Sequence, residues 1–346
     1  MLRGKVRIAP ACYHVLHLIP VMAAHEMNFF HEEGLRESNG FPAYEIIPGG
    51  LVPFGLEKLG LTQAMKEKSI DIALDIMPAT VFFQRARGSD IYIIASWRNQ
   101  RGSVVVSAPD IKSLQELKGR RIGVIEIGGG SHRTMKAMLR TVGLNPDRDV
   151  EWIGRIFSPG NIDALKSGKV DCITLQISKA ERLKKEGFNI LADPKRLYPE
   201  GFPLRVIAAT GRILETNPQF VKAFLKGMIR VYWFIRTQRE NFSYLASLEK
   251  RLRFQSADPE ESTTRFVMGS PESAEVQPFP IDGLATGFEA FLEEEKEAGE
   301  LNYEVPPIRE VCALDLVREA FQELMQREEL KPEYERANAV VKRLGY

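Results

Sequence analysis

Cysteine is scarce in this sequence, which has only three, at Cys12, Cys172 and Cys312. No two of them form a C-x-x-C pair, which argues against a disulfide framework and against a cysteine-rich zinc site. Net charge is also nearly absent, because 47 Lys and Arg residues are balanced by 46 Asp and Glu residues. Such a chain has no bulk attraction to nucleic acid or to an anionic membrane. A small molecule is therefore the expected partner.

Long hydrophobic runs are missing as well. The most apolar windows, such as YIIAS and VIAAT, are far shorter than the roughly 20 residues that cross a bilayer. The N-terminus begins at once with a charged strand pattern, MLRGKVRIAP, rather than with a basic stub and an apolar stretch. We therefore expect no membrane insertion and a cytoplasmic location for the chain as written; a periplasmic location requires a signal sequence upstream of Met1.

The length of 346 residues, 44% of them hydrophobic, suffices for two domains with separate cores. Short β-branched runs alternate with helical patterns over the first two hundred residues, which predicts an α/β fold with mixed, mostly parallel sheets flanked by helices. The predicted strands are 5–9, 44–48, 71–76, 91–96, 102–107, 121–127, 150–154, 171–176, 188–192 and 204–210. The predicted helices between them are 18–31, 54–68, 78–87, 131–142, 160–167 and 178–186.

The pattern changes to helices after residue 210. Asn217 followed by Pro218 is a helix start signal, and the apolar positions that follow recur at helical spacing, which predicts a core helix. The acidic segment FEAFLEEEKEAGEL predicts a second helix with a solvated face. Two more helical segments close the chain, so we expect a helical C-terminal extension.

A glycine run follows the predicted strand RIGVIEI and precedes the predicted helix 131–142. Glycines let the backbone approach a ligand closely, and a helix N-terminus offers unpaired N–H groups. Gly130, Ser131, His132 and Arg133 therefore predict an anion pocket, with Ser131 as the N-cap. The run lacks the Gly-Lys-Ser/Thr ending of a P-loop and the G-x-G-x-x-G spacing, so a nucleotide is not implied. A plain glycine-rich connection is the alternative interpretation.

Several segments, in order over residues 5–240, resemble one protein family. They are IPVMAAHEMNFFHEEGL (19–35), IKSLQELKGRRIGV (111–124), ALKSGKVDCITLQ (164–176) and ETNPQFVKAFLKGMIRVYWFI (215–235). The family comprises the substrate-binding proteins for nitrate, sulfonates, taurine and thiamine pyrimidine precursors. Asn28 stands where the family has a glycine at a helix end, and Asn is the next-best residue for that left-handed position.

The resemblance implies the two-lobed type II periplasmic binding protein fold. Domain I takes residues 1–104 and 207–346, with its helical part from about 217, and domain II takes 105–206. The hinge is expected near 102–107 and 204–210, and the ligand in an interdomain cleft that closes by hinge bending. The resemblance further implies a monomer that partners an ABC permease. No metal site and no cofactor are expected.

By the resemblance, the ligand-binding residues follow the strand ends. They are Cys12, Tyr13, His14, Asp75, Met77, Trp97, Gly130, Ser131, His132, Arg133, Phe157, Ser158 and Gln176. Arg98, Arg101, Arg133 and Arg155 favour an anion, since Arg suits a carboxylate or sulfonate clamp. Aromatic residues, among them Tyr13, Trp97, Phe157 and Phe202, are suited to enclose a ring. The expected ligand is a sulfonate, a carboxylate or a heteroaromatic acid.

An enzyme on the same fold is the alternative. A desulfinase of this fold uses a cysteine at a place similar to Cys12, so a desulfinase-like or decarboxylase-like lyase would use Cys12 with His14 or His132. That desulfinase also brings a His and an Arg-Gly-Gly segment, and the matching region GGLVPFGLEKLG (49–60) has neither. The pyridoxal phosphate chemistry of the thiamine pyrimidine synthases is also not expected, because Asp75 and Ala79 stand at their lysine and histidine positions. Binding without chemistry is the preferred hypothesis.

Overall fold

A computed structural model describes residues 5–10, 15–47, 63, 65, 70–156, 160–255 and 279–343 of the chain. The predicted helix 54–68 lies outside the described residues except for Gln63 and Met65.

The chain divides into two compact units. Unit 1 consists of Met1–Gln100, Glu200–Glu295 and Leu301–Tyr346. Unit 2 consists of Arg101–Pro199 and Lys296–Glu300. The hinge expected near 102–107 and 204–210 stays a prediction.

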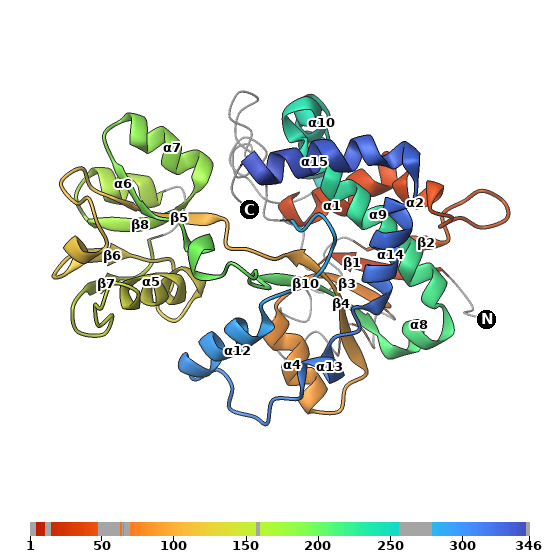
Figure 1. The fold of residues 1–346 in the computed structure, drawn as a ribbon, viewed down its shortest axis with the longest axis horizontal. Coiled ribbons are helices and arrows are strands. Elements are labelled where there is room, and N and C mark those ends of the chain that lie inside the picture. Colours follow the sequence, from red (N-terminus) through yellow and green to blue (C-terminus); the bar gives the residue numbers. More distant parts are fainter. Residues whose placement is uncertain are drawn as a thin grey trace. The chain divides into compact units, whose positions relative to one another are not determined.

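Sheet 1, in unit 1, has the strand order β2-β1-β3-β10-β4 (Figure 1). β1 lies parallel to β2 and β3, whereas β10 lies antiparallel to both β3 and β4. β10 comes from a distant part of the sequence and fills the place between β3 and β4. The bounds are β1 Val6–Pro10, β2 Tyr44–Ile46, β3 Ile72–Ile76, β4 Ile91–Arg98 and β10 Arg205–Thr210.

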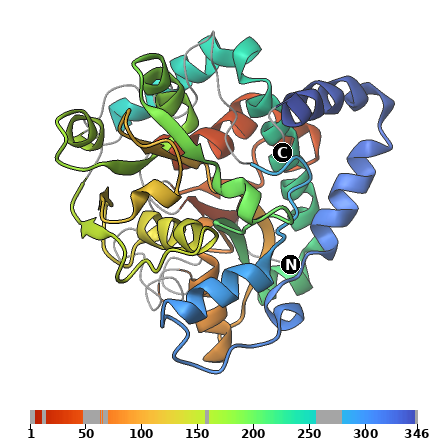
Figure 2. The same ribbon diagram turned by 60° about the vertical axis from the view of Figure 1, so that its left-hand side comes forward.

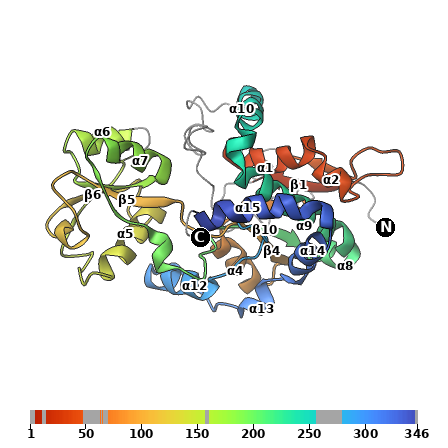
Figure 3. The ribbon, with the colours of Figure 1, turned by 45° about the horizontal axis from the view of Figure 1, so that its top comes forward.

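The helices of unit 1 enclose a single core. α1 and α9 lie on one face of sheet 1 and α4 on the other (Figures 1 and 3). α14 and α15 pack on α9, and their side chains join the same core cluster (Figure 2). The bounds are α1 Val15–Glu26, α2 Phe29–Glu32, α4 Pro78–Ala86, α8 Gly211–Thr216, α9 Pro218–Arg236, α10 Gln238–Gln255, α12 Phe288–Glu297, α13 Ile308–Val311, α14 Asp315–Met325, η4 Glu328–Leu330 and α15 Lys331–Arg343.

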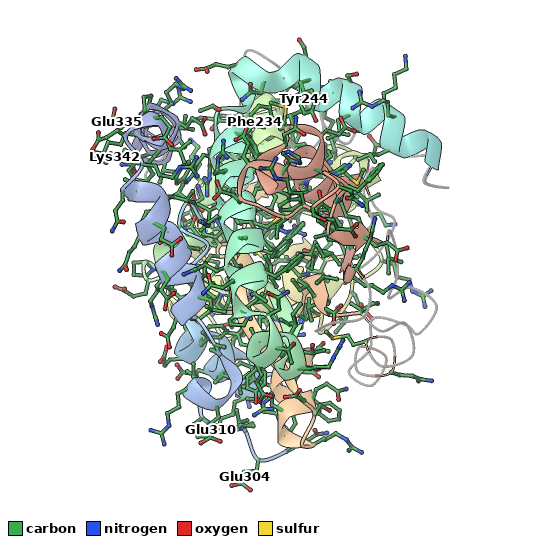
Figure 4. The ribbon with its side chains drawn as sticks, turned by 90° about the vertical axis from the view of Figure 1, so that its right-hand side faces the viewer. Phe234, Tyr244, Glu304, Glu310, Glu335 and Lys342 are labelled. Atoms are coloured by element: carbon green, nitrogen blue, oxygen red, sulfur yellow. The ribbon has the colours of Figure 1, made fainter. Side chains whose placement is uncertain are left out.

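The predicted core helix is confirmed in α9. Asn217 caps it by accepting a hydrogen bond from the N–H of Phe220, and Pro218 occupies its first turn. The aromatic side chains along α9 are mostly buried, from Phe220 to Trp233. At its end Phe234 meets Tyr244 of α10 edge to face, with ring centroids 5.7 Å apart (Figure 4). The stripe therefore serves packing.

Sheet 2, in unit 2, has the order β7-β6-β8-β5-β9. β6 is parallel to β7 and β8, and β5 is antiparallel to β8 and β9. α6 and α7 cover one face and α5 the other, so that two separate hydrophobic clusters form (Figure 3). The bounds are β5 Ser103–Ser107, η2 Gln115–Leu117, β6 Arg121–Gly123, α5 Gly130–Arg140, β7 Glu151–Ile153, α6 Gly160–Lys166, β8 Cys172–Gln176, α7 Ile177–Lys185, β9 Asn189–Ala192 and η3 Pro194–Leu197.

Each predicted strand corresponds to an observed one, and the α/β class with mixed sheets is confirmed. The strand predicted at 121–127 is too long, because β6 ends at Gly123. Ile125 and Ile127 beyond it are exposed, so the apolar run does not continue into the core. Asn28 adopts the predicted left-handed conformation, with φ 63°.

Candidate ligand-binding site

Four strand ends meet at one edge of sheet 1. β3 and β4 end there, and the antiparallel β10 begins there, with Arg205 opposite Arg98 and Val206 opposite Ile76. β1 ends at the same edge, because Pro10 pairs with Leu74. Ligands of α/β sheets gather at the carboxyl ends of the strands.

A buried carboxylate, Asp75, organises this edge. Its Oδ1 lies 3.0 Å from Nη2 of Arg98, and its Oδ2 lies 3.0 Å from Nε2 of His17 in α1. Nε of Arg205 lies 3.9 Å from the same Oδ1. Nη2 of Arg98 also lies 3.3 Å from Nε2 of His17. One acidic side chain thus holds two guanidinium groups and an imidazole. We call these four residues the Asp75 cluster.

The backbone at Asp75 is unusual. Its φ is 64°, in the left-handed region that Asp tolerates better than most residues. Val206 and Ala208, which are two residues apart in β10, pair with Ile76 and Ala73, which are three residues apart in β3. β3 therefore carries one extra residue, a β-bulge, and bulges re-aim side chains near functional sites.

The charges fix the ionisation of Asp75. Burial alone would raise the pKa of its carboxyl group, but Arg98, His17 and Arg205 outweigh that effect and hold the pKa well below its usual range. Asp75 is therefore an anion across the physiological pH range.

Two other sequence-predicted residues flank the cluster. Trp97 is fully buried and packs edge to face against Phe279, with centroids 6.1 Å apart. A side chain with no exposed surface does not reach a ligand, so Trp97 is left out of the site proposed below. Met77 is exposed at the start of α4. Phe202 is also buried, against Phe291 (5.6 Å).

In unit 2, the glycine turn leads into α5 as predicted, but with a different cap. The helix begins at Gly130 with Gly129 as its N-cap, so the prediction that Ser131 caps it is wrong. The hydroxyl of Ser131 instead accepts a hydrogen bond from the N–H of Ile125 (3.4 Å). The glycines at positions 128 to 130 differ in role, since only Gly128 has a positive φ, 86°. α5 leaves the N–H groups of its first turn without intrahelical acceptors.

His132 faces into this turn. The N–H of Gly128 donates to its Nδ1 (2.9 Å), which makes Nε2 the protonated nitrogen of the neutral ring. The ring also meets Trp152 edge to face, with centroids 4.4 Å apart. Burial lowers its pKa, and the nearby Lys136 and Arg133 lower it further, against the opposing charge of Asp147. His132 therefore supports the turn as a neutral side chain.

Arginines stabilise the same helix start. Arg101 donates to the carbonyl of Gly130 (3.2 Å) and to the hydroxyl of Thr134. Arg133 donates from Nε to the carbonyl of Gly128 (2.8 Å). Arg98 belongs to unit 1, so the four arginines of the sequence analysis divide between the two units.

The structure does not describe the side chains of the remaining predicted site residues. Cys12, Tyr13, His14, Phe157 and Ser158 are not among the described residues, and only the backbone of Gln176, at the end of β8, is described. Their roles stay predictions.

The other two cysteines, Cys172 buried and Cys312 partly buried, have thiols with raised pKa values. Burial raises the pKa of Cys312 to about 12 and that of Cys172 further, so neither is a thiolate at neutral pH. In the described ranges no group of three or more His, Cys, Asp or Glu residues could hold a metal ion.

Sequence reasoning missed His17 and Arg205. His17 lies in the first turn of α1, and Arg205 is the first residue of β10 rather than a residue that follows a strand. Only the antiparallel insertion of β10 places an N-terminal strand residue at this edge. The one sequence signal available for Arg205 was its charged side chain near the start of the predicted strand 204–210.

The chain is similar to several known proteins. The family model described as NMT1/THI5 like matches residues 16–240. A Haemophilus influenzae protein, named as a candidate thiamine biosynthesis protein, is 25% identical over 272 residues, covering 77% of this chain and 72% of the relative.

Solved structures share the fold at low identity. The periplasmic aliphatic sulphonate binding protein SsuA from Escherichia coli has a TM-score of 0.60 and 17% identity, with 91% of this chain and 99% of that chain covered. A mutant of the desulfurization enzyme DszB, in complex with biphenyl-2-sulfinic acid, has a TM-score of 0.56 and 15% identity, with 93% of this chain and 100% of that chain covered. The chain therefore has the periplasmic binding protein fold. No described helix is both long and apolar enough to cross a membrane.

Proposed function

Because the chain belongs to the NMT1/THI5-like family, we propose that it binds a small organic anion. Each unit by itself offers groups that suit an anion, and in this proposal the protein delivers its ligand to an ABC permease. Two of the solved structures that share this fold are an aliphatic sulphonate binding protein and an enzyme in complex with biphenyl-2-sulfinic acid. Organic sulfur oxyanions therefore come first among the candidate ligands, followed by carboxylates and heteroaromatic acids.

The Asp75 cluster carries the proposal. The Asp75 side chain is only 2% exposed, whereas those of Arg98, His17 and Arg205 are 15%, 19% and 30% exposed. A ligand at this edge meets the cationic side of the cluster rather than the carboxylate. Guanidinium groups match carboxylate and sulfonate oxygens in geometry, and a preorganised guanidinium loses little entropy on binding.

In this assignment Asp75 is a positioning residue. It holds Arg98 and His17 at fixed distances without contacting the ligand. The expectation that Asp75 itself binds the ligand is therefore not carried into the proposal.

Unit 2 contributes hydrogen-bond donors at the start of α5. The first-turn N–H groups, the hydroxyl of Ser131 and the guanidinium of Arg133 are of the kind that binds an anion. The turn follows β6, at the carboxyl end of a parallel strand, as the Asp75 cluster does in sheet 1.

A binding panel tests the proposal. Thermal unfolding is measured with sulfonates, sulfinates, carboxylates and pyrimidines, and a ligand at a hundred times its Kd stabilises the folded state by about 2.7 kcal/mol. In Arg98→Gln we expect affinity for the ligand so found to fall at least about tenfold, since a charge-assisted hydrogen bond is lost. Arg318→Gln, on the exposed face of α14, is the matched control and keeps the wild-type affinity.

Stabilisation by none of these compounds contradicts the proposal. Product release distinguishes the lyase alternative from binding alone. An enzyme would release sulfite from a bound sulfinate or carbon dioxide from a bound carboxylate, and the Cys12→Ala variant would release neither. The binding proposal expects stabilisation with no product released.

A further inference from the structure

The described part of the chain has few exposed large hydrophobic side chains, and most of them follow the end of a strand. They are Phe41, Met77, Ile125 and Ile127, with exposed fractions of 65%, 39%, 49% and 55%. Met77 follows β3 directly, beside the Asp75 cluster, and the two isoleucines follow β6. Three of the four thus lie just beyond the carboxyl end of a strand, where ligands of α/β sheets bind.

The backbone that carries the two isoleucines is held in place. The N–H of Arg155 donates to the carbonyl of Ile125 (3.0 Å), and the N–H of Ile156 donates to the carbonyl of Val124 (3.0 Å). A Cβ at Gly154 would lie 3.4 Å from Cγ1 of Ile127, so this isoleucine packs beside a residue that has no side chain. The segment is therefore fixed to the end of β7, and the exposure of its apolar side chains is built into the turn.

Polar donors adjoin this apolar surface. The N–H of Ile125 hydrogen-bonds the Ser131 hydroxyl, which places the isoleucine next to the first turn of α5. Arg133 follows in the same turn and Arg155 in the adjacent segment, whereas Glu126 is the one acidic residue between Val124 and Arg133. Apolar surface beside excess positive charge and helix N–H groups complements a molecule with an apolar body and an anionic head.

We propose that Ile125 and Ile127 form an apolar platform for the body of the ligand. The assignment rests on the proposed function and narrows the ligand class to amphiphilic organic anions. These are alkyl or aryl sulfonates and carboxylates with several carbons. Small hydrophilic oxyanions such as nitrate have no body for the platform to contact. They therefore gain nothing from it.

A chain-length series tests the platform. The Kd values of linear alkanesulfonates and of linear carboxylates, from one to eight carbons, are measured by calorimetry for the wild type and for the double variant Ile125→Ser, Ile127→Ser. Burial of each methylene contributes about a fourfold gain in affinity. We expect the wild-type Kd to fall by about that factor per added carbon, and the double variant to show less than a twofold gain per carbon.

Two controls separate the platform from general effects. The double variant keeps its affinity for the one-carbon ligand within about twofold and its wild-type unfolding temperature, because both side chains are half exposed in the folded protein. Phe41→Ser removes an apolar side chain of unit 1 that is somewhat more exposed than either isoleucine, and it keeps the wild-type chain-length dependence.

The outcomes distinguish the two proposals. An affinity that does not depend on chain length in the wild type, or an unchanged dependence in the double variant, overturns the platform while the binding function stands. Failure of the wild type to bind any member of either series, or any other compound of the panel above, overturns the binding function and the platform with it.

Discussion

At the scale of the residue, the loss of the Asp75 carboxylate should strongly lower the stability of the protein. Asp75→Asn keeps the shape of the side chain and its tolerance of the left-handed backbone, but it leaves Arg98 and His17 without their shared anion. Removing one partner of a buried ion pair costs about 3–5 kcal/mol. We expect a loss of that size at pH 7 in the free energy of unfolding, measured by urea denaturation.

The pH dependence of this effect has a defined sign. The folded-state pKa of Asp75 is lowered, so its stabilisation is complete above the unfolded value of about 3.9 and is lost as pH falls through the folded value. The difference between wild type and Asp75→Asn should therefore be constant near neutrality and shrink below about pH 4. Asp163→Asn, at an exposed position, is the control and changes little at any pH. A difference that grows on acidification contradicts the assignment.

His132 should titrate below its usual value. Burial lowers its pKa first, and the charges of Lys136 and Arg133 add to the effect. Lys136→Gln removes a repelling charge and frees Asp147, which lies 2.7 Å from Lys136, to act on the imidazole. An NMR titration of the ring should give a pKa below about 6.5 in the wild type and a higher value in the variant. A lower value in the variant contradicts this account.

At the scale of the element, one buried glutamate joins three helical segments. Glu33, at the end of α2, lies 3.2 Å from Arg230 and 3.3 Å from Lys226, both on α9. It also lies 2.6 Å from Arg327, just before η4. Glu33→Gln should therefore lower the free energy of unfolding by about 3 kcal/mol. Glu328→Gln, at an exposed pair, should change it by less than about 0.5 kcal/mol.

The elements were largely predictable from the sequence because their signals are local. Asn28 at its left-handed position and Asn217 with Pro218 at the start of α9 are set by backbone geometry within a few residues. The length of β6 was not predictable, because the exposure of Ile125 and Ile127 depends on the turn into α5 and not on their hydrophobicity. The Ser131 cap failed because a glycine one residue before the helix can take that place.

The place of Asp75 after a strand was predictable from the sequence, but the residues that contact it were not. Asp75 was identified from its place after a strand, whereas His17 and Arg205 reach it from a helix and from a strand remote in sequence. The burial of Trp97 was not predictable either, since alternate residues of a strand point to opposite faces and only the structure shows that both faces are covered. Partners that meet through tertiary contacts leave no pattern in one sequence.

At the scale of the whole molecule, each unit has its own core. The cluster of sheet 1 draws only on unit 1, and the two clusters of sheet 2 draw only on unit 2. Leu165→Ala in unit 2 and Leu245→Ala in unit 1 each remove a buried side chain, at a cost of about 2–5 kcal/mol. We expect calorimetry to resolve two transitions, with each variant lowering a different one. A single transition lowered equally by both variants contradicts separate cores.

The place of β10 also bears on how the chain is made. β4 has β10 as its single strand partner in sheet 1, yet residues 205–210 leave the ribosome after every strand of sheet 2. Sheet 2 can therefore form during synthesis while sheet 1 still has an open edge, since domains made as contiguous segments fold as units. Before β10 is synthesised, Asp75 lacks its contact with Arg205, and the β-bulge of β3 cannot form because it depends on pairing with β10. The Asp75 cluster is thus completed only after every strand of sheet 2 has been made.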